Sequence, residues 1–305
     1  MFDFARHWQR VTPASLALLP ASGLFYVLAA LRRLLYRAGV LTSQRLPVPV
    51  VVVGNVVVGG AGKTPVVLEL ARMLHEEGYR PGIVSRGYRG SAAGAREVFP
   101  DSDVEEVGDE ALLLARSDAE GVWVGKDRVA AARALLKAHP RCDLVICDDG
   151  LQHYRLGRDI ELIVEDERGH GNGFPLPAGP MREPASRRAD ARIVNGAAMP
   201  TSVRDKPVFR MSLIFEAVED IHRGQKSRDL SVLQGKRVHA VAGIGNPDRF
   251  FRQLRTLGIE AVPHAFPDHH PFSSGDLIFP ACDAIVMTEK DAVKCRRLNA
   301  PPGVV

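Results

Sequence analysis

Apolar and polar residues alternate in two repeating patterns along most of this chain. Short continuous apolar runs, such as residues 47–53, are typical of strands buried on both faces of a parallel sheet. Stretches of helical periodicity follow them. One example is 64–77, where Leu68, Leu70, Ala71 and Leu74 are expected to point inward. This alternation predicts an α/β fold built from doubly wound, mostly parallel sheets.

The remaining pattern predicts where further elements and domain boundaries lie. Further strands are expected near 81–85, before Asp148, and at 159–167, 191–195, 207–215, 238–242 and 283–287. Residues 169–190 lack apolar periodicity and read as a long ordered loop, a length that usually means function. The polar stretch 222–236 is a plausible linker. We therefore predict an N-terminal segment (1–46), a P-loop domain (47–228) and a smaller C-terminal α/β domain (229–305).

A glycine-rich turn separates the first apolar strand from its helix and is the strongest candidate for chemistry. We call residues 57–64 the glycine loop. Its members are Val57, Val58, Gly59, Gly60, Ala61, Gly62, Lys63 and Thr64. In a P-loop, backbone N–H groups surround the phosphates of a nucleotide, the lysine pairs with β- and γ-oxygens, and the hydroxyl binds Mg²⁺. A P-loop has glycine where this chain has Val57, so a turn that binds nothing is the alternative.

Two adjacent aspartates close a buried strand later in the chain. Asp148 and Asp149 follow an apolar run, in the place where a Walker B carboxylate would hold Mg²⁺. Side chains alternate at strand ends, so both cannot face one ion. We expect Asp148 to be the nearer metal ligand together with Thr64, and Asp149 to act behind it or beside the substrate.

The N-terminal segment is apolar and basic. Residues 15–31 carry no charge, but they include Pro20 and Gly23 and are short for a bilayer span. Leu24, Leu28, Leu31 and Leu35 share one helical face, and Arg33 and Arg37 share another. The pattern favours a helix lying in the membrane interface, with its leucines and Phe25 in lipid and its arginines at the phosphates. The alternative is a first helix packed on the core.

Charge and cysteine content exclude some classes of protein. Residues 1–48 hold six arginines and one acidic residue, a net charge of +5, whereas the whole chain has a net charge of +4. The rest has 34 basic and 35 acidic groups, a net −1, which argues against a nucleic-acid surface. The four cysteines show no metal-ligand spacing and suit buried thiols in a reducing compartment.

Short motifs occur in the order of one known family. In chain order they are VGNVVVGGAGKTP, SRGYRG, VGDE, DDGLQH, LPAGPMREP, FPDHH and TEKDAVK. Through them, from about residue 10 to 295, the chain resembles the tetraacyldisaccharide 4′-kinases, the lipid A 4′-kinases of Gram-negative bacteria. That family also lacks the first P-loop glycine, so Val57 is compatible with nucleotide binding.

The resemblance implies a complete function. It implies a kinase that uses ATP and Mg²⁺ to phosphorylate the 4′-hydroxyl of a tetraacyl glucosamine disaccharide 1-phosphate, forming lipid IVA in lipid A biosynthesis. It also implies an outlying P-loop fold with a smaller second domain and a membrane-associated N-terminal helix. The protein would be peripheral or monotopic on the cytoplasmic face of the inner membrane. Its partners would be the acylated disaccharide lipid and an anionic membrane surface, and not nucleic acid.

The same resemblance assigns roles to individual residues. Asp109 and His269 match a pair that prepares the sugar hydroxyl, with His270 as a one-residue alternative. Residues 59–64 match the phosphate-binding loop, Asp148 and Asp149 match an acidic pair on the metal side, and Glu183 matches a further active-site carboxylate. We therefore expect Lys63, Asp149 and Glu183 to be catalytic as well. Residues 288–291 match a segment near the nucleotide.

Four arginines are further candidates for contacts with substrate or nucleotide, and two other functions are alternatives to a kinase. Arg86 and Arg182 are candidates for the substrate 1-phosphate or ATP, whereas Arg187 and Arg188 read better as solvated loop charges. A P-loop ATPase or GTPase acting as a membrane-associated switch is the alternative function, and a membrane-bound nucleotide sensor without turnover is a third. The long loop 169–190 and the acidic strand end favour an acceptor site.

Overall fold

The chain forms two compact units. The computed structural model describes residues 8–196, 206–298 and 303–305. The larger unit comprises 1–87, 92–99 and 114–213, and the smaller unit comprises 88–91, 100–113 and 214–305. Two short segments, 88–91 and 100–113, therefore group with the C-terminal part of the chain.

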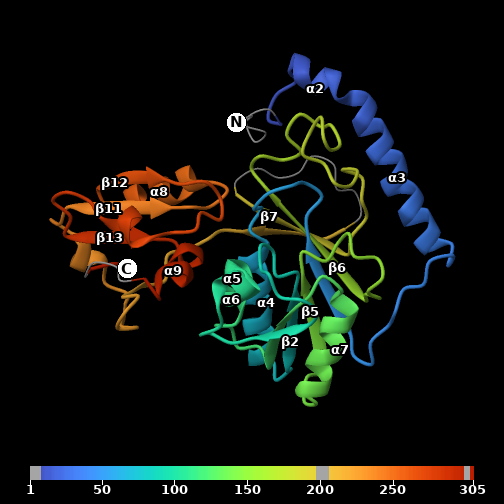
Figure 1. Cartoon of the computed structure of the whole chain (residues 1–305), viewed down its shortest axis with the longest axis horizontal. Helices are drawn as coiled ribbons and strands as arrows, with labels where there is room; N and C mark the ends of the chain where they lie inside the picture. The colour runs from blue at the N-terminus through green and yellow to red at the C-terminus, as the bar shows by residue number, and fades with distance from the viewer. Residues whose placement is uncertain (1–7, 197–205, 299–302) are drawn as a thin grey trace. The chain divides into compact units, whose positions relative to one another are not determined.

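One eight-stranded sheet organises the larger unit (Figure 1). Its order is β3 (Arg96–Val98), β4 (Gly121–Val124), β2 (Pro81–Ser85), β5 (Leu144–Asp148), β1 (Val50–Gly54), β6 (Ile160–Asp166), β7 (Ala191–Asn195) and β8 (Val208–Met211). Only the β3–β4 pairing is antiparallel. The predicted α/β fold with a large, mostly parallel sheet is confirmed.

Helices α4 (Lys63–Glu76) and α7 (Arg128–Ala138) pack on this sheet. The fully buried residues of α4 are Val66, Val67 and Ala71. Of the residues predicted to point inward, Leu68, Leu70 and Leu74 are only half-buried. The helix rests on the sheet through its first turns, and this places the glycine loop at the carboxyl end of β1.

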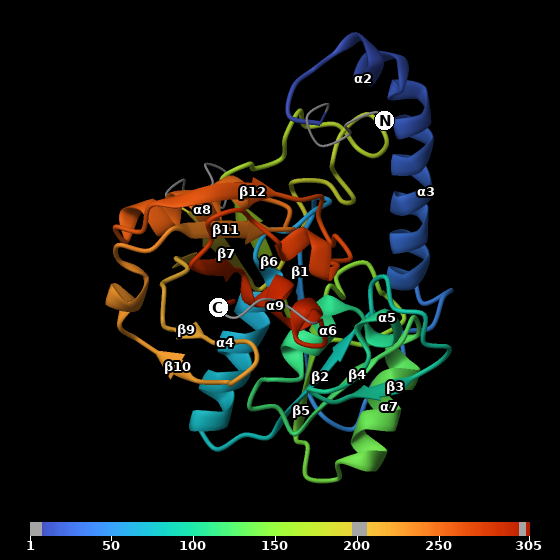
Figure 2. The same cartoon turned by 60° about the vertical axis from the view of Figure 1, so that its left-hand side comes forward.

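The smaller unit has a three-stranded parallel sheet. Its order is β12 (Ala261–Ala265), β11 (Val238–Ala242) and β13 (Ala284–Met287). Helix α8 (Pro247–Thr256) packs on β11 and β12 through Phe251 and Leu254 (Figure 2). The other elements are α5 (Val104–Val107), α6 (Asp109–Leu114), α9 (Glu289–Cys295), the antiparallel pair β9 (Val218–Glu219) and β10 (Lys226–Ser227), and the 3₁₀ turns η1 (Leu230–Leu233) and η2 (Ser274–Leu277).

Within the described residues 8–49, two helices precede β1 in the larger unit. Helix α2 (Pro13–Ala17) begins with a capping box between Thr12 and Ser15, and α3 (Leu19–Arg37) follows it directly. Among the helices that the structure describes, none combines the length and the apolar content that crossing a membrane requires.

Candidate functional site

The glycine loop takes a shape that only glycine permits at its end. Gly62 precedes α4 with φ of +94°, in the left-handed region. A Cβ at Gly62 would lie 2.5 Å from Asn195 Nδ2 and 3.0 Å from Met211 Cε. Gly59 also has a positive φ, of 108°. The loop therefore turns sharply out of β1 and delivers Lys63 and Thr64 to the first turn of α4.

Three polar side chains hold the carbonyl groups of this loop. Asn55 Nδ2 donates to Gly59 O at 3.1 Å, Arg168 Nη2 donates to Gly60 O at 2.8 Å, and Asn195 Nδ2 donates to Ala61 O at 3.3 Å. All three donors lie at or just after the carboxyl ends of parallel strands. None of the three was predicted from the sequence. Their signal was a polar residue at a strand end, which is where α/β proteins bind ligands.

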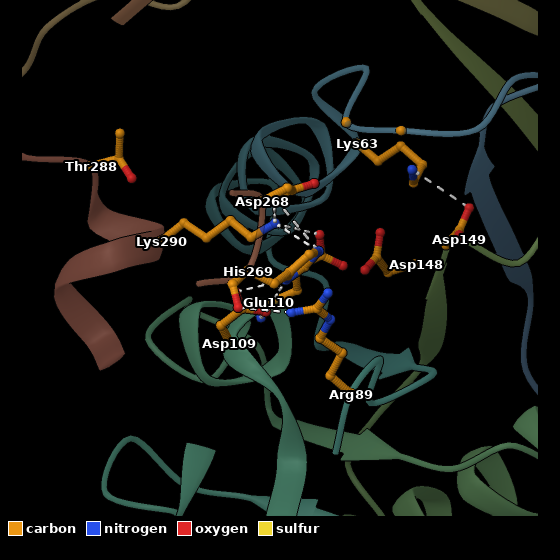
Figure 3. Close-up of polar contacts among 12 residues, drawn as sticks. Lys63, Arg89, Asp109, Glu110, Asp148, Asp149, Asp268, His269, Thr288 and Lys290 are labelled. Carbon is orange, nitrogen blue, oxygen red and sulfur yellow. Dashed lines mark hydrogen bonds and ion pairs between the residues drawn. The ribbon is translucent and has the colours of Figure 1, made fainter. Parts of the chain in front are cut away.

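Lys63 pairs with Asp149 (Figure 3). The Lys63 Nζ lies 3.6 Å from Asp149 Oδ1, and Arg182 Nη1 donates to both Asp149 oxygens at 3.2 Å. Burial acts to raise the pKa of Asp149, but Lys63 and Arg182 outweigh burial and hold it below its usual value. The structure thus joins two predicted catalytic residues and Arg182 in one charge cluster of the larger unit.

Asp148 has a different hydrogen-bond partner from Asp149. It is the last residue of β5, its side chain is buried, and its Oδ2 accepts a hydrogen bond from Ser85 Oγ at 3.2 Å. Asp149, with φ of 46°, leaves the strand in the left-handed region. Adjacent carboxylates are therefore directed differently, as alternation at a strand end requires.

The donor chemistry of Asp148 and Thr64 fits Mg²⁺. A carboxylate and a hydroxyl are hard oxygen ligands, and Mg²⁺ in kinases is held by one or two such groups plus phosphates and water. Within the described ranges, no cluster of three or more His, Cys, Asp or Glu side chains could hold a metal ion by itself. A protein-only metal cage is not needed for this type of site.

Asp109 and His269 form a close pair in the smaller unit (Figure 3). The His269 Nδ1 lies 2.9 Å from Asp109 Oδ1 and 2.8 Å from Asp109 Oδ2. His270 instead lies 3.4 Å from Asp276, in the capping turn of η2. Of the two adjacent histidines, the structure brings His269 to Asp109.

Positive charge surrounds the buried Asp109 carboxylate. Burial acts to raise the pKa of Asp109, but the hydrogen bond from His269 and the charges of Lys290 and Lys294 outweigh it and lower the pKa. Lys294 Nζ lies 3.9 Å from Asp109 Oδ2. Asp109 is consequently ionised at neutral pH and can accept a proton.

Glu183 is engaged within the larger unit. Its carboxylate accepts hydrogen bonds from the Tyr154 hydroxyl and, at 3.2 Å, from Arg33 Nη1 of α3. Its backbone N–H donates to Val56 O at 3.3 Å, next to the glycine loop. The catalytic role predicted for Glu183 stays a prediction, and the contacts show a carboxylate that joins α3 to the loop 169–190.

One of the loop arginines differs from its predicted state. Arg187 is buried and its Nη2 donates to Glu161 at 2.6 Å, so its prediction as a solvated charge is wrong. Arg188 is exposed as predicted, and Arg86 is also exposed. The buried pair fixes the loop that carries Glu183.

The segment 288–291 is used within the smaller unit. Thr288 caps α9 and donates its hydroxyl to Asp291 Oδ2, which also accepts from Gly243 N–H at 2.9 Å. Lys290 pairs with Glu110 at 3.0 Å. A role for this segment near a nucleotide stays a prediction.

Helix α3 presents two different faces. The residues that face the unit include Ser22, Phe25, Ala29 and Arg33, and several of them line a cavity of about 450 Å³ shared with the loop 169–190. Arg33 pairs with Glu183, so its predicted place at the lipid phosphates is wrong. Phe25 is half-buried and lines the cavity, and its predicted contact with lipid stays a prediction. The exposed face carries Leu24, Val27, Leu28, Leu31 and Leu34, whereas Leu35 is partly buried.

Comparison with known proteins decides the family. The family model described as tetraacyldisaccharide-1-P 4′-kinase (LpxK) matches residues 14–304. The chain belongs to this family. A tetraacyldisaccharide 4′-kinase of Aromatoleum aromaticum is 54% identical over 293 residues, which cover 94% of this chain and 87% of the relative. The corresponding kinase of Azoarcus sp. is 51% identical over 95% of this chain and 86% of its own length.

A solved structure of the same family supports the fold. LpxK from Aquifex aeolicus, crystallised in complex with ATP, aligns with a TM-score of 0.80 at 32% identity, covering 93% of this chain and 91% of that one. The tetraacyldisaccharide 4′-kinase resemblance drawn from the motifs is confirmed.

Proposed function

We propose that this protein is an ATP-dependent kinase that phosphorylates the 4′-hydroxyl of a tetraacyl glucosamine disaccharide 1-phosphate, a step of lipid A biosynthesis. The observation that carries the proposal is the family match over residues 14–304, with named 4′-kinases about half identical to the chain. The alternative, a nucleotide-driven switch without an acceptor, is not favoured by these relatives.

The glycine loop is the proposed phosphate site for ATP. Residues 57–64 lead into the N-terminus of α4, where backbone N–H groups and the helix dipole favour phosphate. Lys63, now paired with Asp149 at 3.6 Å, would exchange that carboxylate for the β- and γ-oxygens of ATP. Asp149 and Arg182 would then remain paired close to the transferred group.

Mg²⁺ is the proposed metal, with Thr64 and Asp148 as its protein ligands. When bound, the ion neutralises charge that develops on the phosphates during transfer. Asp148 is ready for this role because Ser85 already orients its carboxylate from β2.

Asp109 is the proposed base for the sugar hydroxyl. Phosphoryl transfer demands positioning and a group that takes the hydroxyl proton as the new O–P bond forms. The carboxylate is buried and ionised, and His269 holds it at 2.8 Å. The larger unit thus carries the groups for the phosphate donor, and the smaller unit carries the base for the acceptor.

The protein is proposed to work at the cytoplasmic face of the inner membrane as a peripheral or monotopic protein. ATP is on that side, and the acyl chains of the substrate keep it in the bilayer. The exposed leucine face of α3 supplies apolar area, and the exposed Arg32 and Arg37 supply attraction to anionic headgroups. We also propose the domain boundaries predicted from the sequence, with an N-terminal segment that ends at residue 46 and a P-loop domain that ends at residue 228.

Transfer of labelled γ-phosphate tests the function. Purified protein with γ-labelled ATP, Mg²⁺ and the acylated disaccharide 1-phosphate in mixed micelles should give a labelled lipid. Lys63→Ala should reduce transfer by at least about 10²-fold, because an electrostatic contact of roughly 3 kcal/mol to the transferring phosphate is lost. Lys137→Ala, which removes an exposed lysine at the end of α7, is the matched control and should be normal. Phosphate release without lipid labelling would support the switch instead.

A further inference from the structure

We propose that Arg168 is a positioning residue for ATP, which holds the carbonyl group of Gly60 so that the N–H groups of residues 60–62 face the phosphates. The inference rests on the proposed kinase function and adds a residue to its phosphate-donor side. Every residue involved lies in the larger unit.

Three successive carbonyl groups of the glycine loop, those of residues 59–61, accept hydrogen bonds from side chains. The donors are Asn55, Arg168 and Asn195, at 3.1, 2.8 and 3.3 Å in that order. In a planar trans peptide group, the C=O and the N–H point in opposite directions. Holding these three oxygens therefore directs the N–H groups of residues 60–62 to the opposite side of the loop.

The N–H groups of residues 60–62 are available to an anion. Within the part of the chain that the structure describes, none of them donates to a backbone acceptor. The first turn of α4, which begins at Lys63, continues the row with N–H groups that a helix leaves unpaired at its start. Successive N–H groups directed to one side form a concave site for phosphate. The contacts on the carbonyl side thus determine the shape of this site.

Arg168 differs from the two asparagines in burial and in reach. Asn55 and Asn195 are 0% and 2% exposed, whereas the Arg168 side chain is 27% exposed. Asn55 directly follows β1 and Asn195 ends β7, so the packed sheet places both amides. The long arginine side chain lies after the end of β6 and requires a support of its own.

Asp166, the last residue of β6, supplies that support. Its Oδ2 accepts a hydrogen bond from Arg168 Nε at 2.8 Å and lies 2.6 Å from Nη2. Its Oδ1 accepts from the Arg168 backbone N–H at 3.1 Å, and the aspartate side chain is 7% exposed. Nη2 carries two protons, so it can serve Asp166 and Gly60 at the same time. A buried carboxylate therefore fixes both the main chain and the guanidinium of Arg168.

The guanidinium also lies close to Gly59. A Cβ at Gly59 would lie 3.4 Å from Arg168 Nη1 and 3.7 Å from Nη2, and φ there is 108°. A side chain at this position would press on the arginine as well as strain the backbone. The glycine therefore lets Arg168 lie across the loop and reach the next carbonyl group.

Titration with ATP and with ADP, each with Mg²⁺ and without lipid, tests the proposal by calorimetry. Arg168→Met should weaken binding of both nucleotides by roughly 10-fold, the contribution of one hydrogen bond from a charged group. Both should suffer because the loop N–H groups meet the α- and β-phosphates, which ATP and ADP share. Arg168→Lys, whose amine can still donate to Gly60 O and Asp166, should lose no more than about threefold. Arg133→Met, which removes an exposed arginine of α7, is the matched control and should bind normally.

Asp166→Asn tests whether the aspartate acts through the arginine. By itself this change should weaken binding of both nucleotides, because the guanidinium loses its charged partner. Added to Arg168→Met, it should weaken binding no further, since the group that Asp166 positions is already gone. Additive losses in the double variant would show that the two residues act separately and would contradict the proposed support.

Kinetics with the lipid acceptor supply the second readout. Arg168→Met should raise the KM for ATP by roughly 10-fold and change kcat by less than about threefold, because binding common to the ground state and the transition state is lost. A loss of affinity confined to ATP would assign Arg168 to the γ-phosphate itself, and normal binding of both nucleotides would show that the loop keeps its shape without it. Either result would overturn the proposal. The titrations need no acceptor, so they test Arg168 even if no labelled lipid is formed.

Discussion

Asp148 and Asp149 are adjacent in the sequence, but their side chains contact different residues. Asp148 ends β5 as a buried acceptor for Ser85, and Asp149 turns through a left-handed φ to meet Lys63 and Arg182. Strand alternation predicted that the two would diverge. It could not predict Arg182, which lies 33 residues away in sequence from Asp149 and reaches it only through the fold of the loop 169–190.

The pair formed by Asp109 and His269 can be tested by substituting each residue and then both. Asp109→Ala should lower kcat by roughly 10²–10⁴-fold with little change in ATP affinity, because the carboxylate serves the acceptor. His269→Ala should act in the same direction, and the double variant should be less than additive because the two side chains act as one group. The measurement is steady-state kinetics with ATP and lipid varied separately.

His270→Ala is the matched control for that test. His270 adjoins His269 but contacts Asp276 in the η2 turn and packs against the Phe266 and Phe272 rings. Because these contacts do not include Asp109, its removal should change kcat by less than about threefold. A silent His269→Ala with a damaging His270→Ala would reverse the assignment.

At the scale of elements, the glycine loop was read from residue types and order. Strand, glycines, Lys-Thr and helix appear in sequence, and the structure has β1, the loop and α4 in those places. The three side chains that hold the loop were not found, because Asn55, Arg168 and Asn195 are brought together by β1, β6 and β7. Pairing of neighbouring strands is a property of the sheet and leaves no local sequence signal.

Two glycine substitutions test whether the glycine loop requires a left-handed backbone at Gly62. Gly62→Ala should lower the free energy of unfolding by roughly 1–3 kcal/mol, because alanine is strained at φ of +94° and its Cβ would meet Asn195. Gly60→Ala, with nothing within 4 Å of its Cβ and no positive φ, should leave it unchanged or raise it by up to ~1 kcal/mol. Denaturant unfolding without nucleotide makes the comparison. Equal losses in both variants would contradict the geometry.

At the scale of the whole molecule, hydrophobic periodicity gave the class of fold and most of the strands. It could not show that residues 88–91 and 100–113 group with the C-terminal unit, which brings Asp109 to His269 across 160 residues of sequence. Nor could it show which face of α3 packs. Leu24 and Arg33 both lie on regular stripes, and only tertiary contacts such as Arg33 with Glu183 choose between them.

Thiol reactivity follows from the distribution of cysteines over the molecule. All four are free, and burial raises the pKa of Cys142 to about 11 and those of Cys147 and Cys295 to about 12. Thiolate is the reactive form, so these three should resist alkylation in the native protein near neutral pH. Cys282, which is partly exposed, should be labelled first. Mass spectrometry should find at most one label per native chain, none in Cys282→Ser, and four after denaturation. Rapid native labelling of Cys147 would contradict the packing.

The exposed leucine face of α3 carries the last prediction. Leu24, Leu28 and Leu31 are 63%, 56% and 48% exposed, and burying one leucine side chain is worth roughly 1.5–3 kcal/mol. Replacing all three with glutamine should reduce sedimentation with anionic vesicles by at least tenfold, while ATP binding and the unfolding midpoint stay unchanged. Substitution is preferable to deletion of α3, because Ser22 and Arg33 on its other face hold the loop 169–190.

The control for that experiment places the same change elsewhere. Val262→Gln with Ile278→Gln removes two exposed apolar side chains from the smaller unit, where they are 51% and 72% exposed. Vesicle binding should be normal in this variant. High salt should weaken binding of the unaltered protein, because Arg32 and Arg37 contribute attraction that salt screens, but should not abolish it, because the leucine contribution is apolar. If the unaltered protein stays in the supernatant at low salt, or if both sets of substitutions act equally, α3 is a packing helix and the membrane proposal fails.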